Sequence, residues 1–156
     1  MKWFVPLVLV LVQCCKAHAE DAPTLHRTCS SIEMKVQNVK YSIERQEHDT
    51  VGALDLRIAT DPSSVEGERV VRLVCQLSKE FAPERVIRAW IFDDKTAARR
   101  LLLQFEGQER HGDYLWHLRG YYELNREGNS EYVEFVFPIY HDHLLQLSRQ
   151  KVVLSR

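Results

Sequence analysis

Two histidines flank a single acid near the end of the chain, in the stretch His141-Asp142-His143. Side chains two residues apart in an extended strand lie on the same face, so these imidazoles could together bind Zn²⁺ or Cu²⁺. A third ligand would have to come from another segment, for example His111 or His117. The simpler interpretation is a turn or helix cap at Asp142, with both histidines in water. We therefore expect no metal and no cofactor, and we retain His141 and His143 as the alternative metal site.

The sequence carries no recognisable motif for nucleophilic catalysis or phosphate binding. It has no Gly-x-Ser-x-Gly elbow, no Walker-type lysine loop and no glycine-rich dinucleotide fingerprint. The neighbouring acids Asp93 and Asp94 are typical of a solvent-exposed turn, and a glycosidase pair would also need a cleft for the sugar. These features favour a protein without enzymatic activity. A hydrolase that uses the region of His141 and His143 is an alternative.

A more extended candidate site lies on two segments in which aromatic and charged residues alternate, 112–125 and 131–139. Tyr and Arg are enriched at protein interfaces, where they contribute much of the binding energy. The sequence therefore predicts a face that binds a protein or a glycan. Its residues are His117, Arg119, Tyr121, Glu123, Tyr132 and Glu134. The alternative is an ordinary solvated sheet face with cross-strand ion pairs, such as one between Arg119 and Glu134.

These two segments are predicted to form a β-hairpin. Each alternates apolar and polar residues with period two, and the polar stretch between them is rich in turn formers. To bring the apolar sides together, the turn must be centred between residues 127 and 128. That register places Tyr122 opposite Val133, with Leu118 and Tyr122 both on the apolar side.

The same period of two recurs along most of the chain after residue 30. Turn signals such as Asp61-Pro62 separate the alternating segments. The predicted strands outside the hairpin are 32–43, with a bulge or break at 37–38 that separates 32–36 from 39–43, and 54–58, 71–77, 86–92 and 101–105. About seven short strands with this spacing are typical of an antiparallel β-sandwich. We therefore expect an all-β, immunoglobulin-like sandwich over residues 30–156, preceded by an N-terminal segment at 20–29, with a small closed β-barrel as the alternative.

Two short stretches are exceptions to this β-rich pattern. Residues 96–100 are expected to form one helical turn, with Asp94 or Thr96 as its cap. After Asp142, the sequence HLLQLSRQK is compatible with a short, capped C-terminal helix. The alternative for this last segment is two further edge strands.

The N-terminus has the features of a secretory signal peptide. A positively charged start is followed by ten apolar residues, 3–12, and Ala17 and Ala19 provide the small residues that a signal peptidase reads. The apolar run is about half as long as the ~20 residues needed to cross a bilayer. We therefore expect residues 1–19 to be removed, the protein to be exported to a periplasm or the extracellular space, and no stable membrane insertion. The alternative is a lipid anchor on Cys15.

After cleavage, Cys29 and Cys75 would be the two remaining cysteines. Two cysteines in an exported domain are most simply paired, so the sequence predicts a Cys29–Cys75 disulfide. Such a bridge would link positions 46 residues apart and, by the loss of chain entropy in the unfolded state, would stabilise the fold by about 4 kcal/mol. The competing interpretation is two free, buried thiols.

Composition limits the classes of partner. Without residues 1–19, which contain two lysines and no acid, the formal net charge is −3. A weakly acidic surface argues against nucleic acids and anionic membranes, because both bind basic faces. The sequence thus predicts an exported, non-enzymatic binding or structural module with a protein or glycan partner. The main alternative is a barrel that carries a small apolar ligand, with Trp116, Phe135 and Phe137 lining its interior.

Overall fold

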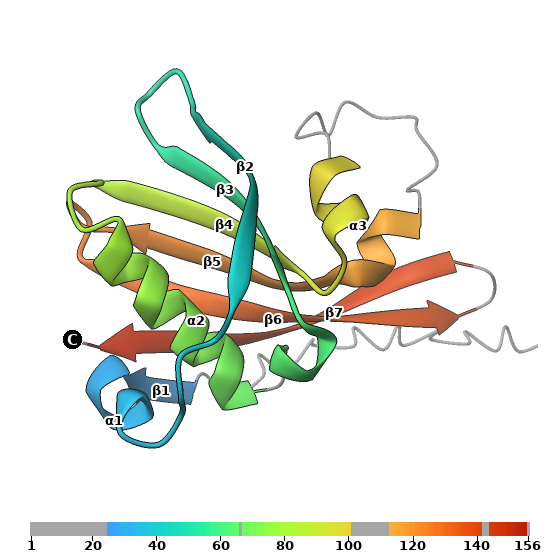
Figure 1. Ribbon diagram of the computed structural model, residues 1–156, viewed down its shortest axis with the longest axis horizontal. Coiled ribbons are helices and arrows are strands. Elements are labelled where there is room, and N and C mark those ends of the chain that lie inside the picture. The colour runs from blue at the N-terminus through green and yellow to red at the C-terminus, as the bar shows by residue number, and fades with distance from the viewer. Residues whose placement is uncertain (1–24, 66, 101–112, 142–143, 156) are drawn as a thin grey trace, which may run out of the picture.

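The computed structural model describes residues 25–65, 67–100, 113–141 and 144–155 (Figure 1). Residues 1–19, expected to be a signal peptide, and the strand expected at 101–105 lie outside this part of the chain. The elements in chain order are β1 (Leu25–Thr28), α1 (Cys29–Glu33), β2 (Tyr41–His48), β3 (Leu54–Thr60), η1 (Pro62–Ser64), α2 (Gly67–Glu80), β4 (Val86–Phe92), α3 (Lys95–Arg100), η2 (Asp113–His117), β5 (Leu118–Asn125), β6 (Ser130–His141) and β7 (Leu144–Ser155).

Seven strands form one open, mixed sheet in the order β1-β7-β6-β5-β4-β3-β2. The pairs β1/β7 and β3/β4 are parallel, and the other neighbouring strands are antiparallel. The β-rich class and the expected number of strands are therefore confirmed. The antiparallel, immunoglobulin-like sandwich is not, because helices rather than a second sheet pack against the described strands. The sheet also does not close into a barrel, since β1 and β2 lie at its opposite edges.

The largest departure from the predicted strands is α2, which contains the segment 71–77. Its buried residues are Val70, Val71, Leu73, Val74, Cys75 and Leu77. These residues are one, three or four positions apart, which places them along one side of a helix. The alternate residues 71, 73, 75 and 77, which suggested a strand, are a subset of this buried stripe. Glu68 in the first turn and Lys79 in the last turn also favour a helix, because their charges oppose the helix macrodipole. The strand expected at 71–77 is therefore wrong.

The strand expected at 32–36 is also wrong. Helix α1 begins after Thr28, whose hydroxyl accepts a hydrogen bond from the N–H of Ser31 at 3.3 Å. A disulfide joins Cys29 of α1 to Cys75 of α2, with the Cα atoms 5.7 Å apart, which confirms the predicted pairing. A helix as short as α1 is not stable alone in water. This covalent link to α2 is therefore a main source of its stability.

For the C-terminal segment the sequence left a short helix and two edge strands open, and the structure has one strand, β7, in place of the helix. Strand β7 pairs with β6 along its length and with β1 on its other side. Val152 and Leu154 are buried in the core that the sheet shares with α2. A helix in this place would leave β6 as an unpaired sheet edge and would remove these side chains from the core.

The hairpin of β5 and β6 has the predicted register, with Tyr122 opposite Val133. The pairing of β4 with β5 shifts by one residue at its far end, where Phe92 opposes Leu118. This irregularity turns Leu118 to the side of the sheet opposite Tyr122, so the prediction that both lie on one apolar side is wrong.

Helix α3 agrees with the helical turn predicted at 96–100. Asp94 caps it, because its Oδ1 accepts a hydrogen bond from the N–H of Ala97 at 2.7 Å. Together with η2, α3 builds a small second core at one end of the sheet. Its buried residues are Ala59, Phe92, Ala97, Ala98, Leu115, Leu118 and Val136.

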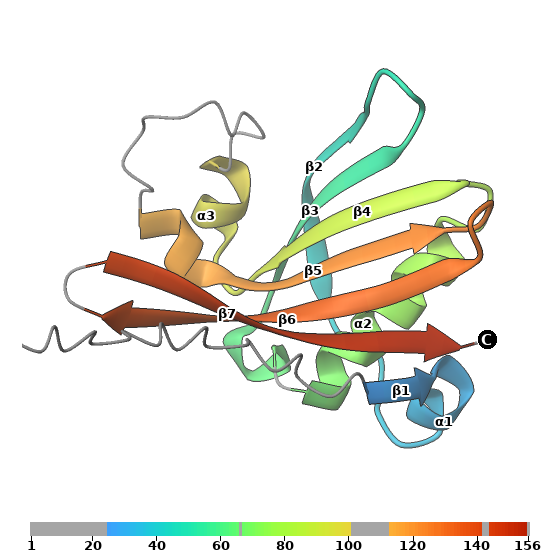
Figure 2. The ribbon, with the colours of Figure 1, turned by 180° about the vertical axis from the view of Figure 1, so that it is seen from behind.

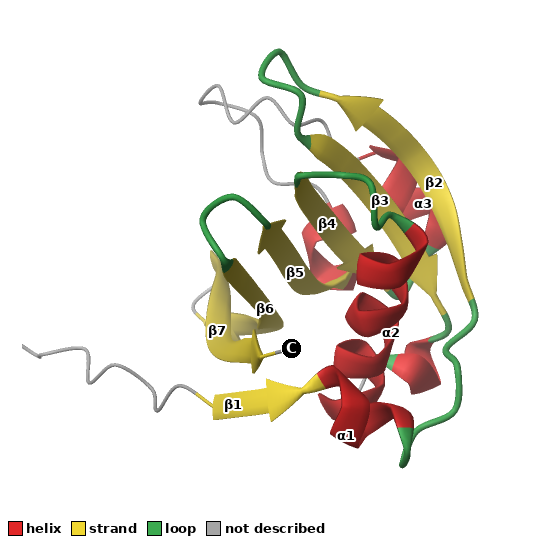
Figure 3. Cartoon of the chain, turned by 90° about the vertical axis from the view of Figure 1, so that its left-hand side faces the viewer, coloured by secondary structure: helices red, strands yellow, loops and turns green. Residues whose placement is uncertain are grey.

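The two sides of the sheet are covered differently. On one side α1 and α2 pack against the strands, and Figure 3 shows the sheet curling around α2. The main core lies on this side and includes Leu56, Ile91 and Tyr122. On the other side, α3 and η2 lie at one end of the sheet (Figure 2). No described helix covers the middle of β3, β4, β5 and β6 on that side.

Candidate binding face

Two rows of side chains run across the side of the sheet that faces away from α2. In the first row, the strand register aligns Asp55, Arg88, Glu123 and Tyr132, on β3 to β6. In the second row, it aligns Arg57, Trp90, Tyr121, Glu134 and Lys151, on β3 to β7. We call these residues, together with Arg149 of β7, the polar face.

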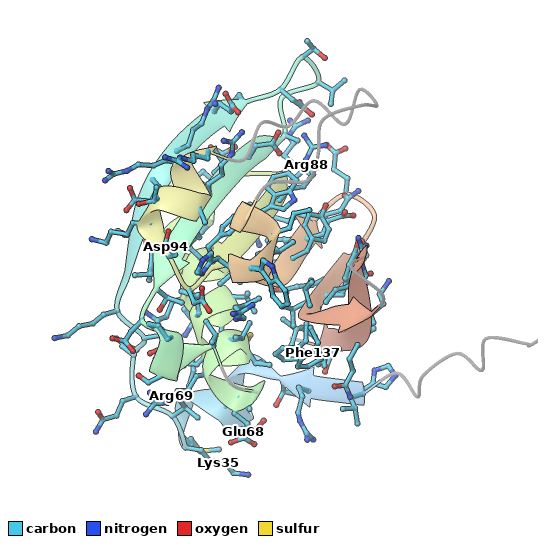
Figure 4. All side chains as sticks on the ribbon, turned by 90° about the vertical axis from the view of Figure 1, so that its right-hand side faces the viewer. Lys35, Glu68, Arg69, Arg88, Asp94 and Phe137 are labelled. Carbon is cyan, nitrogen blue, oxygen red and sulfur yellow. A yellow bond between two sulfur atoms is a disulfide. The ribbon has the colours of Figure 1, made fainter. Side chains whose placement is uncertain are left out.

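Arg88 links β4 to β3 on this face. Its Nε donates to Oδ1 of Asp55 at 2.7 Å and its Nη2 to Oδ2 at 3.1 Å, which is a bidentate ion pair. Its Nη2 also donates to Asp49, in the turn before β3. Backbone N–H groups of that turn, first that of Ala53, lower the pKa of Asp49 and keep it charged. The carboxylates of Asp55 and Asp49 therefore hold the Arg88 guanidinium in place. Figure 4 shows Arg88 near the top of the view, far from Glu68 and Arg69 at the start of α2.

Glu123 accepts hydrogen bonds from two tyrosines. The hydroxyls of Tyr121 and Tyr132 donate to the same atom, Oε2, at 2.9 and 3.0 Å. Burial, and then the bond to Glu123, raises the pKa of Tyr132 to about 12 and also raises the pKa of Tyr121. Both hydroxyls are therefore protonated donors at neutral pH, and the shared acceptor orients both rings.

Three aromatic rings from adjoining strands lie along the polar face. The ring centroids of Trp90 and Tyr121 are 5.3 Å apart, and those of Tyr121 and Tyr132 are 6.3 Å apart. Both pairs are tilted, by 56° and 58°, which is a favourable arrangement of aromatic quadrupoles. Nζ of Lys151 lies 3.8 Å from the centroid of the Tyr132 ring. Because the three rings are half-buried, they present apolar surface between charged groups.

The structure brings together four of the six residues predicted to bind a partner, namely Tyr121, Glu123, Tyr132 and Glu134. Glu134 does not pair with Arg119, as the alternative interpretation supposed. Its Oε2 lies 3.3 Å from Nη1 of Arg149 on the neighbouring strand. The role of these four residues in binding stays a prediction.

The other two predicted residues, His117 and Arg119, make contacts elsewhere. His117 is the last residue of η2 rather than part of a strand, and its Nδ1 lies 2.7 Å from Oδ1 of Asp93. Arg119 approaches the other oxygen of the same carboxylate, with Nη2 2.6 Å from Oδ2. The register shift in β5 causes this, because it takes Arg119 out of the alternation on which the prediction depended.

Six further residues belong to the polar face but were not predicted, namely Asp55, Arg57, Arg88, Trp90, Arg149 and Lys151. The sequence contains one signal for them, since Arg88 is the charged exception in the otherwise apolar segment 86–92. An unmatched charge in a central strand predicts an opposite charge on a neighbouring strand. Without the strand order, however, the neighbour could not be named.

The contact between His117 and Asp93 is the arrangement closest to an acid–base site. A carboxylate at Nδ1 favours the tautomer with its proton on Nδ1, which leaves Nε2 as a proton acceptor on a half-exposed ring. In the described part of the chain, however, no Ser, Thr or Cys forms a hydrogen bond with this imidazole. The pair therefore orients a base but provides no nucleophile for it to activate.

The predicted alternative sites fall partly outside the described residues. His143 lies outside them, and only the backbone of His141, at the end of β6, is described. Among the described residues, no group of three or more His, Cys, Asp or Glu is placed to hold a metal ion. None of the described helices is long and apolar enough to cross a membrane.

The residues expected to line a barrel interior lie in three different environments. Phe135 is buried in the main core. Trp116 lies in η2 and is partly exposed. Phe137, labelled in Figure 4, is 50% exposed. A groove of about 830 Å³ lies elsewhere, between the start of α2 and the segment 35–40. Its charged lining residues are Lys35, Lys40, Asp61, Glu68 and Arg69, so it is not suited to an apolar ligand.

Comparisons with known proteins add no assignment to this geometry. No protein-family model matches the sequence, no curated protein matches it, and no solved structure matches the fold. Any function must therefore be derived from the residues of the polar face and their contacts.

Proposed function

We propose that this protein is an exported, non-enzymatic binding module whose partner is a protein that docks on the polar face. The observation that carries the proposal is the row of three half-buried aromatic rings. Tyr121 and Tyr132 lie on a part of the sheet that no described helix covers, and Trp90 lies beside them, packed against the second core. Half-buried Trp and Tyr residues contribute disproportionately to binding between proteins.

The order of these side chains supports the proposal. The shared bonds to Glu123 fix both tyrosines, and the two carboxylates beside Arg88 fix that guanidinium. Side chains that are already ordered lose little conformational entropy when a partner docks. The alternating charges around the rings would orient the partner, while the rings would provide the desolvated centre of the interface.

Export is supported by two independent features. The disulfide between Cys29 and Cys75 is typical of oxidising compartments, and residues 1–19 have the pattern of a signal peptide. The partner is therefore expected in a periplasm or outside the cell. The mixed charge of the polar face fits a partner protein that carries both signs of charge rather than a nucleic acid.

Capture from the native extracellular or periplasmic fraction tests the proposal. The immobilised mature protein should retain a partner that Tyr121→Ala fails to retain, because that substitution removes the central ring. Tyr41→Ala is the matched control, since Tyr41 is also a half-buried tyrosine bonded to a carboxylate, that of Glu80 on α2. The control should retain the partner as the wild type does.

Two outcomes would contradict the proposal. If Tyr121→Ala retains every protein that the wild type retains, the polar face is not the docking surface. If the retained molecule is a glycan, the face is correct but the class of partner is wrong. Thermal unfolding of each variant ensures that lost capture is not lost folding.

A further inference from the structure

Arg57 is a buried cation without a full set of partners. It lies on β3 between Arg45 and Trp90 in the cross-strand register, and its side chain is 2% exposed. Its nearest carboxylate oxygen, Oε1 of Glu47, is 3.9 Å from Nη2, which is too far for a hydrogen bond. Its Nε and Nη1 are buried and have no hydrogen-bond partner among the described residues.

The acids around Arg57 are already engaged by other donors. Asp55 takes both bonds from Arg88, and Glu47 lies 2.8 Å from Nη2 of Arg45. Glu123 and Glu134, further along the polar face, are engaged by the two tyrosines and by Arg149. Among the described residues, none of these acids accepts a hydrogen bond from Arg57.

An unpaired, buried guanidinium is costly. Removing an ion from water is unfavourable by several kcal/mol unless a counter-ion and hydrogen bonds replace the water. Burial, and then the nearby charge of Arg45, lowers the pKa of Arg57, although Glu47 and Asp55 act against this. Unsatisfied buried donors in a folded protein require an explanation, and an ion or ligand that completes them is one such explanation.

We propose that Arg57 anchors a binding site for a small organic carboxylate. The planar guanidinium matches a carboxylate in shape and in hydrogen-bonding direction. A single negative charge is favoured over the double charge of phosphate, because Asp55 and Glu47 lie nearby and would repel the excess. Trp90, the cross-strand neighbour of Arg57, is an aromatic residue that suits an organic anion better than a halide. Arg57 and Trp90 also belong to the polar face, but the carboxylate site is argued from Arg57 and does not rest on the proposed protein partner.

The burial of Arg57 limits the size of the ligand. Because the side chain is only 2% exposed, neighbouring side chains must shift to admit even a small group. Acetate is therefore the appropriate probe, with chloride and phosphate at the same ionic strength as comparisons. An adventitious site for any anion would respond to all three.

Two measurements on the mature, disulfide-bonded protein test the site. In the first, the Nε–H signal of Arg57, assigned by its loss in Arg57→Lys, is followed by NMR during an acetate titration. It should shift and saturate with acetate but not with chloride or phosphate. In the second, thermal unfolding is measured in acetate. At ten times the Kd, acetate should raise the apparent folding constant of the wild type about 11-fold.

Variants separate this site from a general effect of acetate. Arg57→Met should abolish the acetate response, and in acetate-free buffer it should be at least as stable as the wild type, because the unpaired charge is gone. Arg149→Met, a matched control on the same face with a side chain 61% exposed, should keep the full response. If Arg57→Met does not fold, the NMR titration of the wild type still decides.

The proposal is overturned if acetate leaves the Arg57 signal unchanged, or if chloride shifts it equally. It is also overturned if Arg57→Met shows the same acetate response as the wild type. Loss of partner capture by Tyr121→Ala would not bear on these results, so this site and the proposed docking surface can fail separately.

Discussion

Tyr121 and Tyr122 are neighbours on β5, yet their side chains lie on opposite sides of the sheet and in different surroundings. Tyr122 is fully buried against α2, and its hydroxyl donates to Glu131 at 2.8 Å in the core. Tyr121 is half-buried on the polar face and shares Glu123 with Tyr132. The same strands thus use one set of alternate residues to build a core and the other set to build an ordered, accessible surface. We therefore expect changes on the α2 side to alter stability, and changes on the polar face to alter binding.

The disulfide should show the largest effect of any change on the α2 side. Replacing Cys29 and Cys75 together with Ala opens a loop closed across 46 residues and should lower the free energy of unfolding by about 4 kcal/mol. Chemical denaturation of the double variant against the oxidised wild type measures this difference. A loss well below 1 kcal/mol would show that the α2 side does not depend on the link between α1 and α2.

The paired tyrosines give a direct test with the same chemical change. Tyr122→Phe removes a donor from the buried carboxylate of Glu131, which is 6% exposed, and should cost about 1–3 kcal/mol. Tyr121→Phe removes a donor from a half-buried carboxylate that water can reach, so its cost should stay below about 1 kcal/mol. Equal losses in denaturant unfolding would remove the distinction between the two sides.

The pKa values of the tyrosines on the polar face provide a further test, because they depend on Glu123. In the folded protein the pKa of Tyr132 is raised to about 12, and an unperturbed tyrosine titrates near 10. The stability that this raised pKa provides is complete below pH ~10 and is lost as the pH rises towards the folded value. Glu123→Gln should lower the pKa of Tyr121 and Tyr132, as measured by tyrosinate absorbance.

Tyr41 is the control for that titration. Its pKa is also raised, by burial and then by Glu80 on α2, so Glu123→Gln should leave it unchanged. A uniform change in all three tyrosines would mean that the substitution disturbs the whole sheet. No change at Tyr121 and Tyr132 would mean that Glu123 does not control them.

The smallest effect is expected at the outer margin of the polar face. Arg149 pairs with Glu134 at 3.3 Å, but its side chain is 61% exposed. Exposed ion pairs of this kind contribute little, so Arg149→Met should change the free energy of unfolding by less than about 1 kcal/mol. A larger loss would show that the polar face also stabilises the fold, and the contrast between the two sides would weaken.

Sequence reasoning succeeded where the contacts are local. The register of the β5–β6 hairpin follows from two alternating segments joined by a short turn, and Asp94 as the cap of α3 follows from its position before that helix. The hairpin also contributes Tyr121, Glu123, Tyr132 and Glu134, the part of the polar face that was found. The disulfide was predicted because, of the four cysteines, two would remain after the expected removal of residues 1–19, and two cysteines allow one pairing.

Sequence reasoning failed where one pattern fits two structures. Alternate apolar residues at 71–77 fit a strand, but with Val70 and Val74 they also fit the buried stripe of α2. For the segment after Asp142 the sequence left a helix and edge strands open, and the sheet decided for a strand because it offers two partners, β6 and β1. Tertiary packing overrides local preference in both places.

The sequence by itself determined which side chains of a strand lie on the same side wherever the strand is regular, because successive residues alternate between its two sides. It also determined the hairpin and the cysteine pair. The tertiary structure alone decided that β3, β4 and β5 are neighbours, and so that Asp55, Arg88 and Glu123 meet in one row. Alternation orients a side chain within its strand but carries no information about which distant strand lies beside it. For β3 and β4 that choice depends on α2, which connects the two strands in the chain and packs against the sheet.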